Sequence, residues 1–111
     1  MMKVPVILTA EEHDALIAYK DNIVSLPLLF DHKDYLIAHE MPVQNIDNEI
    51  DLLLKQLHLF ESIMDRIQDR RKRVIFRFRY ALGMKIPDIA FIMNLSNQTI
   101  IKESRIDLKD L

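Results

Sequence analysis

The chain of 111 residues contains no cysteine, one glycine and four prolines. The absence of cysteine excludes a disulfide framework, a thiol nucleophile and a zinc site with thiolate ligands, and it suits a reducing compartment, so we expect a cytoplasmic protein. One glycine leaves little material for the tight turns of many-stranded folds, and no apolar run approaches the roughly 20 residues of a membrane-spanning helix. We therefore expect an all-α protein that does not cross a membrane.

Charge is distributed unevenly, although the formal net charge is only -2. Between residues 66 and 79 seven basic residues accompany a single acid, Asp69. These basic residues are Arg66, Arg70, Arg71, Lys72, Arg73, Arg77 and Arg79. The acids lie mostly upstream, so a local basic face is the candidate for phosphate contact. The alternative is a solvated helix face whose charges pair with the upstream acids.

Two helices are predicted in the first forty or so residues. Thr9 and Glu12 have the spacing of a capping box, which predicts a helix over 10–24. Pro27 then interrupts the pattern, because proline lacks the amide hydrogen that a helix interior requires. A second, short helix is expected over 28–39.

A long amphipathic helix is predicted from Asn45, a good N-cap residue. Its apolar positions alternate steps of four and three for three heptads. They are Ile46, Ile50, Leu53, Leu57, Phe60, Met64 and Ile67. This spacing suits either a hairpin with the first helix or the seam of a homodimer. Packing within the chain is favoured, because Leu52, Leu54 and Leu59 widen the apolar face beyond a two-stranded stripe.

Three further helices are predicted after residue 68. The first covers 69–81, as a continuation of the long helix or as a new helix that starts around Asp69, and it stops at Gly83, which can adopt the left-handed conformation. The second covers 87–93 and opens on a proline, which is favourable at the first helical position. Asn94 is expected to end it in the left-handed conformation. After a tight turn the third begins at Asn97, with Ser96 as its N-cap, and runs on through the closing leucines. Two short helices joined by such a turn form a helix-turn-helix. The predicted organisation is an N-terminal helical interaction or dimerisation region, 1–68, and a helix-turn-helix region, 69–111.

A series of residues in this region follows a recognisable order. In chain order it consists of the arginine-rich, aromatic segment 73–80 with Gly83, the acid-Ile-Ala core 88–90, the aliphatic-Ser turn 95–96, the Thr-Ile pair 99–100, and Leu108 and Leu111. The series resembles the promoter-reading region four of sigma factors and the related phage late-gene activators of the ArpU type. It departs from that family at Lys85 and Asn94, where Ser or Thr and Gly are usual. The resemblance implies a small transcription regulator of phage or mobile-element origin that contacts promoter DNA.

Eight residues are candidates for contact with DNA. They are Arg77, Arg79, Ser96, Asn97, Gln98, Thr99, Lys102 and Arg105. The resemblance implies phosphate or polymerase contact for the first two. A helix N-terminus suits phosphate, and Asn or Gln can pair bidentately with adenine. Because Gln98, Lys102 and Arg105 follow at steps of four and three, we expect them to share one face of the last helix.

A protein-interaction module is the rival hypothesis. In the predicted last helix Glu103, Asp107 and Asp110 nearly cancel the basic residues, which weakens attraction to DNA. The chain would then bind RNA polymerase, a sigma factor or another regulator through its acidic N-terminal helices. No metal site is predicted, because the histidines are scattered. No cofactor and no enzymatic activity are predicted, because the sequence has neither a glycine-rich phosphate loop nor a paired nucleophile and base.

The small residue Ala90 supplies a test of the predicted motif. Ile89, Ile92, Leu95 and Ile100 are expected to fill the core where its two helices cross. Replacing Ala90 by Leu should therefore cost about 1–3 kcal/mol of unfolding free energy, since the crossing has no room for extra volume. Thermal unfolding measures this. An unchanged melting temperature would show that Asp88-Ile89-Ala90 is not at a close crossing.

Overall fold

The computed structural model describes residues 5–109 and confirms the predicted all-α fold, with the addition of one pair of short strands. The elements in chain order are β1 (Val6–Leu8), α1 (Ala10–Ala38), α2 (Gln44–Arg66), α3 (Arg70–Phe76), the π-helical turn η1 (Arg77–Ala81), α4 (Ile86–Met93), α5 (Asn97–Glu103) and β2 (Ile106–Leu108). Within the described range, no helix is both long and apolar enough to cross a membrane.

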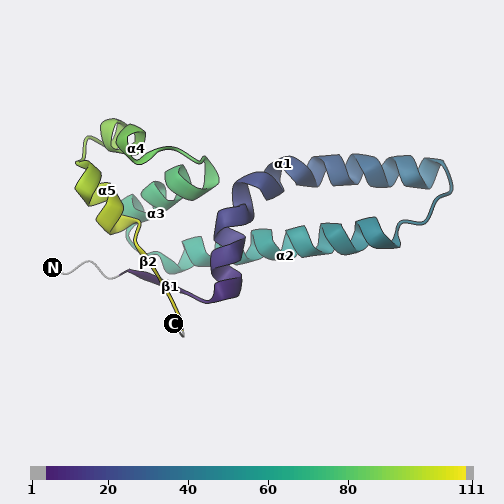
Figure 1. Ribbon diagram of the computed structural model, residues 1–111, viewed down its shortest axis with the longest axis horizontal. Coiled ribbons are helices and arrows are strands. Elements are labelled where there is room, and N and C mark those ends of the chain that lie inside the picture. The colour runs from purple at the N-terminus through teal and green to yellow at the C-terminus, as the bar shows by residue number, and fades with distance from the viewer. Residues whose placement is uncertain (1–4, 110–111) are drawn as a thin grey trace.

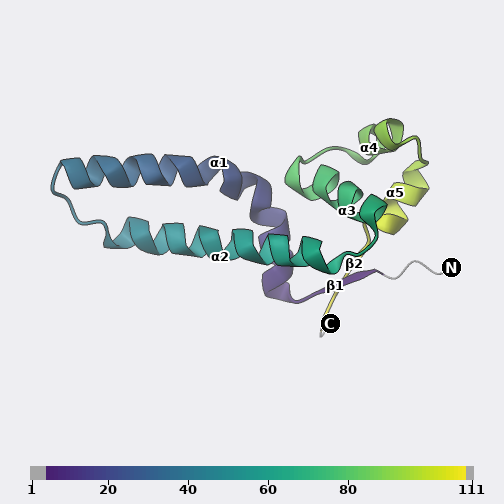
Figure 2. The same cartoon turned by 180° about the vertical axis from the view of Figure 1, so that it is seen from behind.

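An antiparallel hairpin of α1 and α2 projects from the rest of the molecule (Figure 1). Seen from behind, β1, β2 and α3–α5 gather at the other end of this hairpin (Figure 2). The molecule measures 59 × 32 × 21 Å, and its radius of gyration is 17.2 Å. A compact chain of this length would have a radius of about 13 Å. We call the projecting part of the hairpin, residues 22–57, the arm, and the remainder the head.

Helix α1 begins as predicted, but it is one helix rather than two. The capping box is present: the Thr9 amide donates to the Glu12 carboxylate at 3.0 Å, and the Glu12 amide donates to the Thr9 hydroxyl at 3.1 Å. The predicted break at Pro27 is wrong, since α1 continues through it to Ala38. Its axis bends in its first half, before it reaches Pro27 (Figure 1). Packing against α2 on both sides of Pro27 keeps the helix intact.

Helix α2 packs against α1 within the chain, as favoured from the sequence. It begins two residues earlier than expected. Val43 flanks its start without a side-chain cap, so Asn45 is not the N-cap. The heptad positions Ile46 and Ile50 are buried against α1 in the arm. In the head the ring of Phe60 stacks on that of Tyr19, with 3.7 Å between centroids.

Two hydrophobic cores lie in the head. The first is built from Leu8, Leu16, Phe60, Ile63, Met64, Ile67 and Phe76. The second is built from Ile75, Ile89, Ala90 and Ile100. Ala90 is buried as expected, but Ile92 is 58% exposed, so its expected place in the core is wrong. The first core draws on residues from both sides of position 68, where the sequence places its region boundary.

The helix formed by α3 and η1 is the wall that the two cores share. Phe76, Tyr80 and Ala81 pack on the first core, and Ile75 and Phe78 pack on the second. The π-helical turn widens the helix, with the Leu82 amide bonded to the carbonyl of Arg77, five residues back, at 3.1 Å. Gly83 ends the helix in the predicted left-handed conformation, with φ of 66°.

The last helix is shorter than predicted. It ends at Glu103 instead of continuing through Leu108, and residues 106–108 form β2, which pairs in parallel with β1. Two interactions explain why the helix ends at Glu103, one at the helix end itself and one with the distant strand β1. The Ser104 hydroxyl donates to the Ile100 carbonyl at 2.6 Å at the helix end, and β1 supplies hydrogen-bonding partners that a longer helix would forgo. The other expected closing leucine, Leu111, lies outside the described residues.

The strand β1 gives a matched pair of substitutions. Leu8 is fully buried in the first core, whereas its neighbour Ile7 is exposed on the other face of the strand. Leu8→Ala should cost about 2–5 kcal/mol, and Ile7→Ala less than about 1 kcal/mol. Urea unfolding of both variants tests this. Equal losses would mean that the strand pair does not close the core.

Candidate nucleic-acid interface

The turn between α4 and α5 has the geometry expected for a helix-turn-helix. Asn94 takes the left-handed conformation with φ of 56°, and the Leu95 amide donates to the Ala90 carbonyl at 2.9 Å. The Ser96 hydroxyl accepts from the Thr99 amide at 3.1 Å and is therefore the predicted N-cap of α5. Local sequence signals account for this turn: Asn tolerates positive φ, and Ser competes well for helix N-termini.

An exposed edge of α5 faces away from the second core. We define the α5 edge as Asn97, Gln98, Ile101 and Lys102, all of which are exposed. Within residues 5–109 the polar side chains of this edge form no hydrogen bond or ion pair, so their donors and acceptors can meet a ligand. Two of the predicted contact residues, Ser96 and Thr99, are engaged differently. Their hydroxyl oxygens lie 2.9 Å apart and belong to the helix cap.

Arg105 does not belong to this edge. The prediction that it shares a helical face with Gln98 and Lys102 is wrong, because α5 ends before it. Its side chain is exposed and pairs with Asp107 of β2 at 3.5 Å. A surface pair of this length is weak, so the guanidinium can still exchange partners.

Arg77 and Arg79 lie on η1, where both have partners within the chain. Arg77 pairs with Glu61 at 3.1 Å across half-exposed surface, and its guanidinium lies 6.0 Å from the centre of the Phe60 ring. Arg79 donates to the buried hydroxyl of Ser104 at 2.6 Å. Both arginines therefore contribute to the fold, and their printed partners, Glu61 and Ser104, are not residues of the α5 edge.

The rest of the basic cluster is also largely engaged. Arg66 pairs with Glu12 at 2.7 Å. Arg73 donates twice to the carbonyl of Ile67, at 3.0 and 2.6 Å, and so satisfies the end of α2. The alternative of charges paired with upstream acids thus describes Arg66 as well as Arg77.

A buried ion pair joins α3 to the end of α5. Glu103 is 1% exposed, and its carboxylate accepts from the Arg71 guanidinium in a two-point contact whose Nε–Oε2 distance is 3.1 Å. The hydrogen bond and the charge of Glu103 raise the pKa of Arg71. From the sequence Glu103 counts as an acid that opposes DNA; in the structure it is buried and paired. No periodicity links positions 71 and 103, so only the fold identifies this pair.

Apolar side chains are exposed on the helix-turn-helix unit. Phe91 is 88% exposed, and Ile92 is exposed beside it on the outer side of α4. The spacing of Ile86, Ile89, Ala90 and Met93 defines the inner side of α4, so periodicity alone could have placed Phe91 outside. Such a patch is typical of a contact surface.

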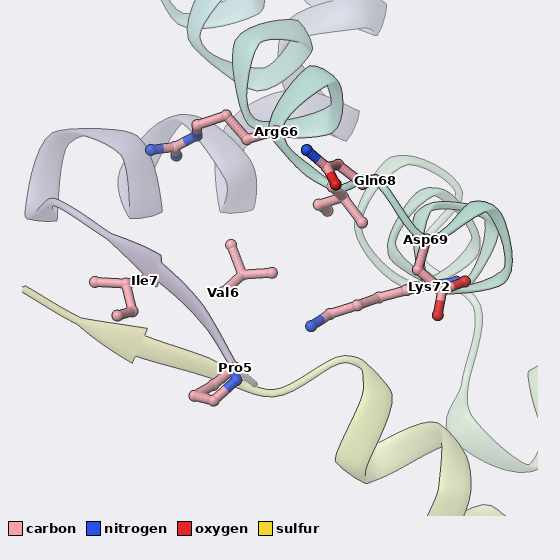
Figure 3. Close-up of a pocket in the computed structure, with 8 residues that line it drawn as sticks. Pro5, Val6, Ile7, Arg66, Gln68, Asp69 and Lys72 are labelled. Carbon is pink, nitrogen blue, oxygen red and sulfur yellow. The ribbon is translucent and has the colours of Figure 1, made fainter. Parts of the chain in front are cut away.

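A hollow of about 330 Å³ lies between β1, the end of α2 and the start of α3 (Figure 3). Lys72 extends from α3 toward β1 across it (Figure 3). Two other charged residues line the hollow, and both stabilise the fold. Arg66 pairs with Glu12, and the Asp69 carboxylate caps α3. In the described part of the chain, the hollow included, no group of three histidine or acidic side chains could hold a metal ion.

Comparison of the chain with protein-family models, curated proteins and solved structures gives no significant match.

Replacing Arg71 should lower the free energy of unfolding, because the buried Glu103 carboxylate loses its partner. Arg71→Met leaves the Glu103 carboxylate without its guanidinium and should cost about 3 kcal/mol. Its exposed neighbour supplies the control, because Arg70→Met should cost less than about 0.5 kcal/mol. Chemical unfolding of the two variants decides the point, and a loss of the same small size in both would contradict a structural role for the pair.

Proposed function

We propose that the chain is a small transcription regulator that binds promoter DNA through α5. The α5 edge supports this proposal most directly, because it presents an amide pair and a cation next to a helix N-terminus. In helix-turn-helix proteins the N-terminal residues of the second helix meet base edges in the major groove. The region-four resemblance points to the same helix.

The electrostatic contribution to such binding should be small. Three exposed cations lie on or beside the helix-turn-helix unit, namely Lys85, Lys102 and Arg105. With about three phosphate contacts, the logarithm of the association constant should fall with the logarithm of salt concentration at a slope of about -2.7. Specific affinity would then depend on the amides of Asn97 and Gln98.

A second function is favoured by Phe91 and Ile92. Their exposed side chains do not suit a DNA backbone, but they suit an apolar protein surface. In this alternative the unit docks on RNA polymerase, a sigma factor or another regulator without reading DNA.

Paired substitutions test DNA reading. Gln98→Ala should weaken binding to a specific site, selected from fragmented genomic DNA, by about 1–3 kcal/mol and change binding to random DNA little. Lys102→Ala should weaken both and reduce the salt slope by about 0.9. Gln44→Ala and Lys55→Ala, which change the same residue types on the arm, should change neither. Fluorescence anisotropy over a salt series measures all four.

The two functions give opposite results in this experiment. If the wild-type chain binds no DNA even at low salt, the DNA-reading proposal fails. Binding of purified RNA polymerase that is lost in Phe91→Ala and kept in Gln98→Ala would then support the docking alternative.

A further inference from the structure

Helix α1 is covered on only one side in the arm, although its apolar side chains surround it. Leu26, Leu29 and Leu36 are partly buried toward α2. Val24, Leu28 and Tyr35 are each more than half exposed. Because these three follow at steps of four and seven, they form one stripe along the helix. A helix that is apolar all round is normally buried on all sides.

A groove beside this stripe joins it to α2. It has a volume of about 310 Å³ and is lined by Asn22, Ser25, Leu28, Leu29, Glu49 and Leu53. Next to it on α2, Leu52 is also more than half exposed. We define the groove face as Val24, Leu28, Tyr35 and Leu52, together with this groove. Both helices contribute to it, so it is wider than a single-helix seam.

We propose that the groove face of the arm binds the same face of a second copy, so that two hairpins form a four-helix bundle. A layer of two helices leaves both of its broad faces open to water. In a four-helix bundle two such layers pack face to face, which buries the apolar side chains of the facing sides. The arm projects clear of the head (Figure 1), so no other element among residues 5–109 covers this face. This inference does not depend on DNA binding.

The area of the face suits such a dimer. Seventeen helical residues of α1, 22–38, span roughly 25 Å, and two helices side by side are roughly 20 Å wide. The face therefore covers roughly 500 Å² in projection, and its accessible surface is larger because side chains stand out from it, so the face approaches the roughly 600 Å² per partner of the smaller stable interfaces. The buried Asn22, whose amide donates to Gln56 at 2.9 Å, places a polar pair beside the seam. This pair joins α1 to α2 within one chain and can fix the register of the hairpin that each copy contributes.

The arm is acidic, but its acidic side chains are not concentrated on the groove face, so the charge does not favour a basic partner for this face. The arm carries six acidic residues and two lysines. Several of the acids lie away from the groove: Asp34 follows Phe30 by one turn on the opposite flank, and Asp47 pairs with Lys33 at 2.7 Å. Two copies would bring like charges together, so salt should strengthen the dimer rather than weaken it.

Sedimentation of the full chain tests the proposal directly. At concentrations from about 1 to 200 µM the wild type should pass from a 13.1 kDa monomer to a species of twice that mass. Raising the salt from about 50 mM to about 0.5 M should favour the dimer. The double variant Leu28→Glu, Leu52→Glu should weaken association at least about 100-fold. The matched variant Phe30→Glu, Ile37→Glu, on the opposite flank, should dimerise like the wild type.

Cross-linking gives a second readout that does not depend on tolerance of buried charge. The chain has no cysteine, so Leu28→Cys introduces a single thiol. A short bis-maleimide should join two copies of Leu28→Cys and leave Phe30→Cys monomeric.

Three results would overturn the proposal. A wild type that stays monomeric throughout, dissociation caused by the opposite-flank variant, or a dimer that salt disrupts would each do so. If the monomer instead bound a synthetic Leu/Lys amphipathic helix and lost it on changing Leu28, the face would belong to a basic helical partner.

Discussion

The contact between Arg71 and the buried carboxylate of Glu103 holds α5 in place. A carboxylate removed from water is costly unless it is paired and hydrogen-bonded, and the planar guanidinium supplies both at once. Arg79 and Tyr80 bind Ser104, the next residue, through its hydroxyl and its carbonyl. The C-terminal end of α5 is therefore fixed to α3 and η1 on its inner side. Its outer edge is left for a ligand.

The position of this helix end also determines how the chain closes. Because α5 stops at Glu103, residues 106–108 are free to pair with β1 and bring Leu8 into the first core. The N-terminal segment, the hairpin and the helix-turn-helix unit thus share one packed head. The basic cluster around residue 71 is mainly a set of internal ties in this head, and the surface charge next to α5 comes from a few other residues.

Local signals in the sequence predicted much of this architecture. The capping box at Thr9, the left-handed residues Gly83 and Asn94, and the N-cap Ser96 depend only on near neighbours, and all four are confirmed. The heptad pattern of α2 suited either a hairpin or a homodimer seam, and the flanking leucines favoured the hairpin, which is present. The exposure of Asn97, Gln98 and Lys102 followed from helical periodicity once the start of α5 was known.

Features that depend on distant partners could not be predicted in this way. Pro27 is tolerated because α2 supports α1 on both sides of it. Residues 106–108 fit a helical repeat as well as a strand, and only the presence of β1 favours the strand. For the same reason Arg105 was expected on α5. Arg79 gave no sequence signal of its contact with Ser104, which lies 25 residues away.

The proposed DNA-binding surface is the outer edge of α5 rather than the arginine-rich helix. This placement can be tested residue by residue. A ¹⁵N-labelled chain is titrated with a DNA duplex that it binds, and the changes in amide chemical shift are measured. We expect changes concentrated at Ser96–Lys102, with small changes along Arg70–Ala81, whose side chains mainly serve the fold. Changes concentrated on Arg70–Ala81 or around Phe91, with residues 96–102 unaffected, would contradict it.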